Sequence, residues 1–173
     1  MSLDNLSALF LNELKDVYNA EKQILTALPR MAKAAESPEL AQAFTKHRKE
    51  TEGHVTRLEQ IFKQLGQAVR GKKCKGMEGL LAEGKEILEE DGNASVIDAA
   101  LISAAQRVEH YEMAAYGCLR TYAGLLGHSE AVELLELTLA EEEAADKKLT
   151  ELGEGGINAA AVAAGEGDEE EAE

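Results

Sequence analysis

Four long stretches of the chain repeat apolar residues every third or fourth position, which is the spacing of an amphipathic helix. In the first stretch, residues 4–35, the apolar positions are Leu6, Phe10, Leu14, Val17, Ile24, Leu28 and Met31. Aromatic residues make up only 4% of the chain, whereas strands are enriched in aromatic and β-branched residues. The sequence therefore predicts an all-α protein.

The ends of the predicted helices carry capping residues. Ser37, Pro38 and Glu39 read as an N-cap, a first-turn proline and an acid at the positive end of a helix. Gly66 and Gly127 each follow an apolar stretch, where glycine commonly ends a helix. After the first helix, the sequence predicts long helices over 38–65, 95–126 and 129–152, and a short one over 77–90.

The lengths of the connections predict the topology. The first two long helices, and the last two, are joined by very short links, so each pair must form an antiparallel hairpin. Residues 67–94 join the hairpins and are long enough to return the chain to its starting end. Two helical hairpins joined by a long crossover, with a short extra helix in it, form the ferritin-like four-helix bundle.

The acidic charge is concentrated at the end of the chain. The net charge is −15, and residues 153–173 hold seven acidic residues and no basic one. This Gly-, Ala- and acid-rich segment has little apolar bulk, so we expect a bundle over residues 1–152 and a disordered tail over 153–173. The acidic balance argues against partners with anionic surfaces, namely nucleic acids and membranes.

The N-terminal sequence and the cysteines bear on the cellular compartment. The start, MSLDNLSALFLNEL, lacks a basic beginning and an uninterrupted apolar core, so we expect no signal peptide or membrane span. Cys74 and Cys118 are far apart in the sequence and form no CxxC pair, which favours two free thiols in a reducing compartment. The sequence therefore predicts a cytoplasmic protein.

Acidic residues interrupt the inward-facing stripe of every long helix. Burying an unpaired carboxylate costs several kcal/mol or more, so a bundle with acids on all four stripes needs a cation at its centre. An oxygen-rich site with few imidazoles suits iron or manganese better than tetrahedral zinc. The candidate ligands are Glu21, Glu50, His54, Glu109, Glu112, Glu142 and Asp146.

Several of these residues also have an ordinary structural interpretation. His54 is equally a metal ligand or a hydrogen-bonded histidine, and His47, two turns away, is expected to be a core or supporting residue. Asp146 ranks below Glu142 because two lysines follow it and offer a salt bridge. Glu141 and Glu143 flank Glu142 and are expected to face solvent, although a one-residue shift in register would turn Glu143 inward.

Four blocks of sequence resemble a known family. They are LKDVYNAEKQILTALPRMAKAAESPELAQAF, HRKETEGHVTRLEQIF, VEHYEMAAYG and LLELTLAEEEAADKKL. Together they resemble the bacterial YciE/YciF family of ferritin-like proteins over residues 3–152 and, more widely, the rubrerythrin and ferritin group of di-iron carboxylate proteins. The resemblance implies a small four-helix bundle associated with stress responses.

The same resemblance implies a ligand set. The di-iron group has Glu on the first helix, Glu and His on the second, one or two Glu on the third, and Glu and His on the fourth. By position, the matching carboxylates are Glu21, Glu50, Glu109, Glu112 and Glu142. This chain departs from the pattern because Gly53 stands where the second-helix His is usual, which leaves His54 as the imidazole, and because Asp146 replaces the fourth-helix His.

Two functions from different classes follow from the sequence. The first is a di-metal protein with two iron ions per chain, or manganese, which acts on a small oxidant such as oxygen or peroxide. The second is a structural or interaction homodimer in which metal is only stabilising or incidental. The homodimer is expected because the short helix offers apolar surface beyond the needs of one bundle. The residues concerned are Leu80, Leu81, Ile87 and Leu88.

Overall fold

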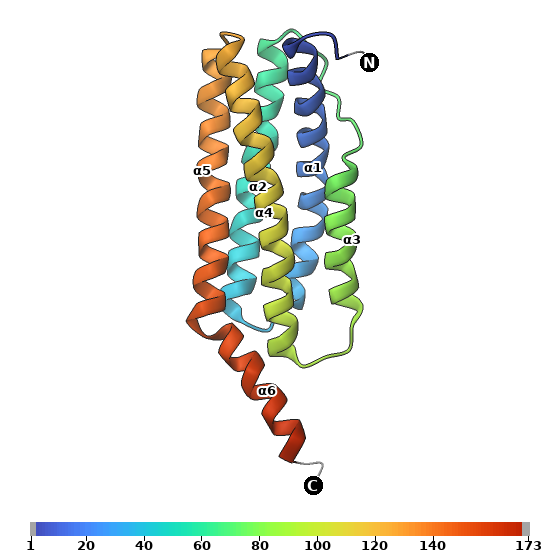
Figure 1. Cartoon of the computed structure of the whole chain (residues 1–173), viewed down its shortest axis with the longest axis vertical. Helices are drawn as coiled ribbons and strands as arrows, with labels where there is room; N and C mark the ends of the chain where they lie inside the picture. The colour runs from blue at the N-terminus through green and yellow to red at the C-terminus, as the bar shows by residue number, and fades with distance from the viewer. Residues whose placement is uncertain (1–2, 171–173) are drawn as a thin grey trace.

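The computed structural model describes residues 3–170, and it describes the side chains of residues 3–164. Within these residues the regular elements are all helical and there is no strand, which confirms the predicted all-α class (Figure 1). The elements are α1 (Leu6–Ala34), α2 (Pro38–Gln64), α3 (Lys75–Glu89), α4 (Ala94–Leu125), α5 (Ser129–Leu152), a π turn (Gly153–Ile157) and α6 (Asn158–Glu170).

The four long helices form two antiparallel hairpins, α1 with α2 and α4 with α5 (Figure 1). The hairpins meet where α2 packs on α5 and α1 packs on α4. The chain crosses between them through a loop and α3, which lies outside the bundle against α1 and α4 (Figure 1). The ferritin-like bundle with a long crossover is thereby confirmed.

Local contacts fix the ends of the hairpins. The Ser37 hydroxyl accepts a hydrogen bond from the Leu40 N–H at 3.3 Å, as expected of an N-cap. The buried carboxylate of Asp98, on α4, accepts hydrogen bonds from the Glu36 N–H at 2.9 Å and the Ser37 N–H at 2.7 Å. These bonds tie the α1–α2 connection to the second hairpin. Gly127 has a φ of 77°, a value that favours glycine, and it makes the tight α4–α5 turn.

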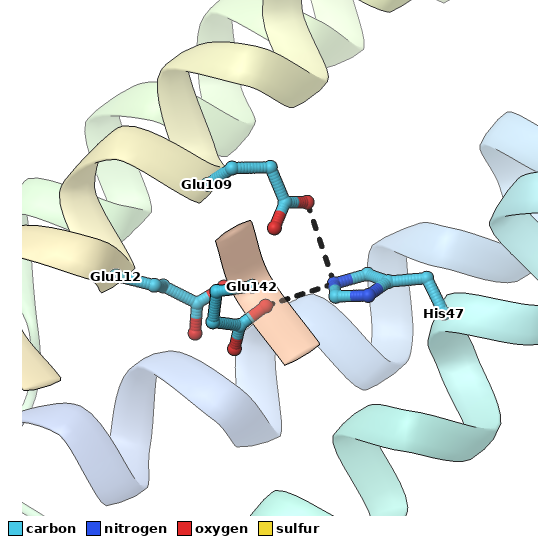
Figure 2. A group of neighbouring side chains, drawn as sticks. All are labelled: His47, Glu109, Glu112 and Glu142. Atoms are coloured by element: carbon cyan, nitrogen blue, oxygen red, sulfur yellow. Dashed lines mark ion pairs between the residues drawn. The ribbon is translucent and has the colours of Figure 1, made fainter. Parts of the chain in front are cut away.

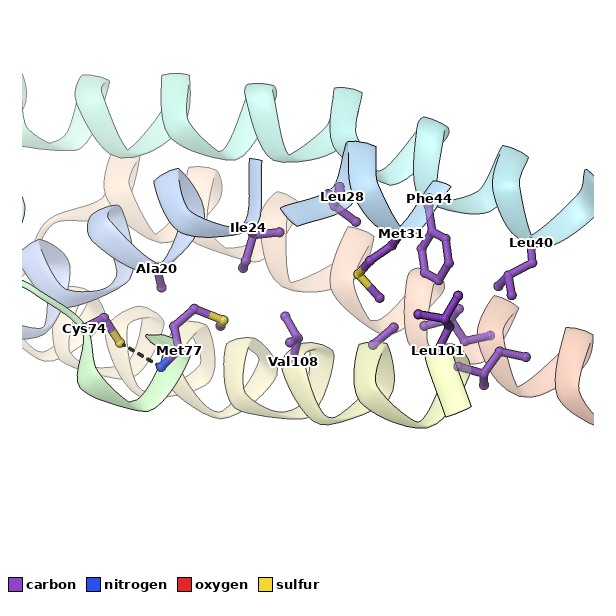
Figure 3. Packing of buried hydrophobic residues seen from close by; sticks show 13 residues of the cluster. Ala20, Ile24, Leu28, Met31, Leu40, Phe44, Cys74, Met77, Leu101 and Val108 are labelled. Atoms are coloured by element: carbon purple, nitrogen blue, oxygen red, sulfur yellow. Dashed lines mark hydrogen bonds between the residues drawn. The ribbon is translucent and has the colours of Figure 1, made fainter. Parts of the chain in front are cut away.

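The apolar core consists of two clusters that lie toward opposite ends of the bundle. The Phe44 cluster lies toward the α1–α2 turn, and Figure 3 shows Ile24, Met31 and Phe44 within it. Its members are Ala20, Ile24, Leu28, Met31, Leu40, Phe44, Cys74, Met77, Leu101, Ile102, Ala105, Val108 and Leu149. The Phe10 cluster comprises Phe10, Leu14, Val17, Leu58, Ile61, Phe62, Tyr116, Leu119, Ala123, Ala131 and Leu135.

The apolar residues of α3 serve the fold of the monomer. Leu80, Leu81, Ile87 and Leu88 are partly buried and pack against the Phe44 cluster. Much of the apolar surface that the sequence analysis assigned to a dimer contact is therefore buried within one chain.

Cys74, at the N-cap of α3, is buried, whereas Cys118 is exposed, and both are free thiols. No helix among residues 3–170 is long and apolar enough to cross a bilayer.

The segment after Gly153 differs from the expected disordered tail. The chain continues through the π turn into α6, which contacts α4 (Figure 1). Ile157 anchors this continuation by packing against the Phe44 cluster, and Gly156, with a φ of 152°, permits the kink that redirects the chain. An alanine-rich run then favours helix. Residues 171–173 of the predicted tail lie outside the described residues.

Candidate metal centre

A layer of ionisable residues separates the two apolar clusters. Along α1, Glu21 interrupts the passage from Val17 of the Phe10 cluster to Ile24 of the Phe44 cluster. On each of the other three long helices, the residues of one cluster likewise give way to those of the other at buried acids or histidines. Every member of the layer is at most 5% exposed, and the members are Glu21, His47, His54, Glu109, Glu112 and Glu142.

One half of the layer is formed by His47, Glu109, Glu112 and Glu142 (Figure 2). His47 Nε2 lies 3.4 Å from Glu109 Oε1 and 3.6 Å from Glu142 Oε2. Each of the four residues offers one atom, and these atoms all lie within 4.8 Å of one another. Glu109 and Glu112 are one turn apart on α4, so both side chains can point at the same place. With His47 from α2 and Glu142 from α5, three helices contribute to this half.

The other half is formed by Glu21, His54 and Glu142, whose ligand atoms likewise lie within 4.8 Å of one another. His54 Nδ1 is 3.0 Å from Glu142 Oε1 and 3.4 Å from Glu21 Oε1. Glu142 thus belongs to both halves, with one oxygen toward His54 and the other toward His47. That is the placement expected of a carboxylate that bridges two cations.

The layer does not satisfy its own hydrogen-bonding groups. Among the described side chains, eight buried nitrogen and oxygen atoms have no hydrogen-bond partner, and all belong to this layer. Leaving such an atom unsatisfied costs about 1–3 kcal/mol, and more for a charged group. The atoms are His47 Nδ1 and Nε2, His54 Nδ1, Glu109 Oε2, and both carboxylate oxygens of Glu112 and Glu142.

Burial and mutual repulsion change the proton affinity of these groups. Burial, and then the nearby carboxylates Glu142 and Glu21, raise the pKa of Glu112 well above its ordinary value. Burial likewise raises the pKa of Glu109, although His47 opposes the shift. Burial alone would lower the pKa of His54, but the carboxylates of Glu142 and Glu21 raise it to about 10. Without a cation the layer therefore holds protons.

We expect the metal-free protein to lose stability as the pH rises from 5 to 9. Glu109 and Glu112 have pKa values above the ordinary 4.5. Their contribution to the free energy of unfolding is therefore complete below pH 4.5 and declines as pH rises through the raised pKa values. His54 contributes fully below pH 6.5 and loses its contribution as pH approaches 10. Thermal melts of chelator-treated protein across this range test the prediction, and a constant or rising melting temperature would contradict it.

Residues around the layer orient its ligands. His54 Nε2 lies 2.9 Å from Glu141 Oε2, so the ring can donate its Nε2–H there and leave Nδ1 free toward Glu142. Arg57 holds Glu141 by donating from Nη1 and Nη2 to its two oxygens at 2.6 and 2.9 Å. Tyr116 donates a hydrogen bond to Glu21. Glu141, which was expected to face solvent, is only partly exposed, because Arg57 and His54 draw it against α2.

Replacing Glu141 with Ala should weaken metal binding by about 10–100-fold, because a carboxylate that accepts the second N–H of a ligating histidine fixes its ring and tautomer. Competition titration against a chromogenic chelator measures the affinity. Glu143→Ala is the matched control, since Glu143 is an exposed acid two residues along α5. Equal affinities for the two variants would contradict the positioning role of Glu141.

The structure brings together five of the seven predicted ligands: Glu21, His54, Glu109, Glu112 and Glu142. Glu50 lies outside both halves, since its carboxylate is drawn outward to Lys46 Nζ at 2.5 Å. Asp146 also lies outside, because it accepts a hydrogen bond from Gln106 on α4 at 3.2 Å and pairs with His110.

His47, expected to play a supporting part, takes the place of Glu50. The sequence held a signal for it, because His47 precedes His54 by seven residues and so lies within about 20° of it on the helix. Tyr18 lies outside the layer, because its hydroxyl donates a hydrogen bond to the carboxylate of Glu59.

Comparison with known proteins shows the family of the chain. Residues 5–162 match the family model described as "Domain of unknown function (DUF892)". The chain belongs to this family. It is 43% identical to Protein YciF of Escherichia coli K12 over 159 residues. The aligned region covers 91% of this chain and 96% of that protein. The resemblance to the YciE/YciF family is thereby confirmed.

Solved structures extend the comparison to three dimensions. The E. coli stress protein YciF superposes with a TM-score of 0.87 at 43% identity, covering 90% of this chain and 99% of that one. YcfI from Rhodopseudomonas palustris gives 0.83 at 43% identity, with 87% and 97% covered. A protein from Xanthomonas campestris pv. campestris gives 0.72 at 20% identity, with 95% and 99% covered, and shares the fold.

Proposed function

We propose that this DUF892 protein binds two metal ions, iron or manganese, in the layer between its apolar clusters. His47, Glu109, Glu112 and Glu142 would hold one ion, and Glu21, His54 and Glu142 would hold the other. The observation that carries the proposal is the set of eight buried ligand-type atoms without hydrogen-bond partners. Atoms of this kind, buried and convergent, are what a bound cation would satisfy.

Charge and donor type support the choice of metal. The layer holds four carboxylates and two imidazoles, so two divalent ions would balance four ionised carboxylates with both histidines neutral. Such an oxygen-rich set with one imidazole for each ion suits iron or manganese, whereas structural zinc sites use more nitrogen and sulfur. The family resemblance to di-iron carboxylate proteins favours iron.

The proposed substrate is a small oxidant, oxygen or peroxide. Ferrous ions held by carboxylates would supply the electrons for reducing an O–O bond, which no side chain of the layer could supply. The chain's own residues would position and insulate the ions: the two apolar clusters exclude water above and below, and Tyr116 fixes Glu21 by a hydrogen bond. The E. coli relative is described as a stress protein, which is consistent with oxidant chemistry.

Metal content tests the proposal directly. Protein purified without a metal-affinity step, then stripped and reconstituted anaerobically with ferrous iron or manganese, should hold about two ions per chain. Elemental analysis gives the number, and anomalous scattering from crystals gives the positions. Absence of metal after reconstitution with either ion would contradict the proposal.

The alternative function is a structural or interaction homodimer in which metal is stabilising or incidental. The observation that favours it is a groove of about 510 Å³ between α1 and α3, whose lining combines the exposed parts of Leu81 and Leu88 with the charged side chains Lys22, Arg30 and Lys85. We expect a dimer in sedimentation velocity at micromolar concentration, since twofold pairing is the commonest closed assembly. A monomer at that concentration would contradict the dimer and leave the metal proposal standing.

A further inference from the structure

A small recess between α2 and α5 reaches the metal centre from the surface. Its lining includes His47 and Glu109, both members of the buried layer, and Lys46, Glu50 and Lys148, which carry charged groups. Its volume is about 40 Å³, which is enough for one water-sized guest. The recess therefore joins the first half of the centre to the outside.

Small side chains keep this recess open. Ala144 and Ala145 of α5 and Ala43 of α2 form part of its wall. Alanines at the seam between two packed helices leave room that leucines would fill. The layer is closed along the bundle axis, because the Phe10 and Phe44 clusters lie on either side of it.

Glu50 links the surface to the buried ligands. Its side chain is 22% exposed, one oxygen is 2.5 Å from Lys46 Nζ, and the other is 3.7 Å from His47 Nδ1. His47 Nδ1 is itself buried without a hydrogen-bond partner. The Lys46 side chain is 71% exposed, so it can leave Glu50 for water at little cost. Glu50 is thus a carboxylate that an incoming cation can reach and Lys46 can release.

The second acid on this seam is closed to an incoming cation. Glu141 touches His54 but is held on both oxygens by the Arg57 guanidinium, which also donates to Thr138 at 3.0 Å. Bidentate arginine pairs are stronger and more rigid than a single lysine contact. A cation that approaches along α2 and α5 therefore meets a fixed positive group at Arg57, whereas the positive groups that line the recess are two lysines, Lys46 and Lys148.

We propose that divalent metal ions enter the centre through the α2–α5 recess, with Glu50 as a transit ligand that passes them to His47 and Glu109. This route rests on the proposed function, since it presupposes that the layer binds metal. Glu50 is then needed for the speed of loading and not for the final number of ions. Lys46 slows loading by competing with the ion for Glu50.

Loading kinetics of the full-length apoprotein test the route, with cobalt(II) as the probe because its visible absorption reports binding. Glu50→Ala should slow loading by about tenfold or more, as expected when a steering carboxylate is lost, while the final stoichiometry equals that of the wild type. Ala145→Leu should also slow loading by narrowing the recess, and Lys46→Met should speed it. Glu52→Ala is the matched control, because Glu52 is an exposed acid on α2.

The outcomes separate the route from the proposed function. Wild-type loading rates in both Glu50→Ala and Ala145→Leu would overturn the route while leaving metal binding intact. A lower final ion count in Glu50→Ala would also overturn it, because Glu50 would then be a permanent ligand. Failure of the wild-type protein to bind cobalt, iron or manganese would contradict the proposed function itself.

Discussion

Loading the metal-free protein with ferrous iron under nitrogen should raise its melting temperature by about 5–10 °C. A ligand that binds only the folded state adds about 2.7 kcal/mol when present at 100 times its dissociation constant. For a chain of this size, each kcal/mol raises the melting temperature by about 2–4 °C. Circular dichroism melts of chelator-treated and reconstituted protein measure the shift.

The size of this shift should depend on pH. Metal binding must displace the protons that the free layer holds on Glu109, Glu112 and His54, so acid competes with the metal. We therefore expect a smaller increase at pH 5 than at pH 8, which is opposite to the trend for the metal-free protein alone. Coincident melting curves at saturating iron and pH 8 would show that no cation bridges the layer.

The fold could be predicted from the sequence because its determinants are local. Apolar spacing defines the helices, and glycines such as Gly66 and Gly127 end them, both with the positive φ that glycine tolerates. Link lengths then decide which helices pair. Glu21, Glu109, Glu112 and Glu142 were also predictable, because a carboxylate within an apolar stripe must be buried if the stripe is.

The remaining features of the site depend on contacts between helices. Glu50 and His47 are one turn apart on α2, and it is His47 that lies against Glu109 of α4 and Glu142 of α5. Glu141 turns inward because Arg57, 84 residues away in the sequence, lies opposite it. The helix after Gly153 likewise depends on a tertiary contact, since Ile157 packs against a cluster built mainly by other helices. Periodicity within one helix puts His47 on the same face as His54, but it carries no information on the contacts that Arg57 and Ile157 make with other helices.

Replacing Glu142 with Gln should abolish binding of both ions, because Glu142 is the residue that the two halves of the layer share. Glu112→Gln should remove the ion of the first half alone, since Glu112 belongs to that half only. Elemental analysis after reconstitution should therefore give no ions for Glu142→Gln and about one for Glu112→Gln. Glu143→Gln, an exposed neighbour on α5, should retain both ions.

Glu142→Gln should stabilise the metal-free protein while destroying the metal site. Glu142 is fully buried, and burial raises its pKa although the facing His54 opposes the shift, so at pH 8 the metal-free fold bears the cost of holding four buried carboxylates against only two imidazoles. Glutamine has nearly the same shape without the charge, and we expect it to add about 1–3 kcal/mol to the free energy of unfolding at pH 8. Denaturant melts of chelator-treated protein measure the change, with Glu143→Gln expected to leave it unaltered. A residue that lowers the stability of the metal-free fold and is required for both ions serves metal binding. If Glu142→Gln instead destabilised the metal-free protein and kept both ions, Glu142 would be a structural residue. The bridged centre would then be wrong.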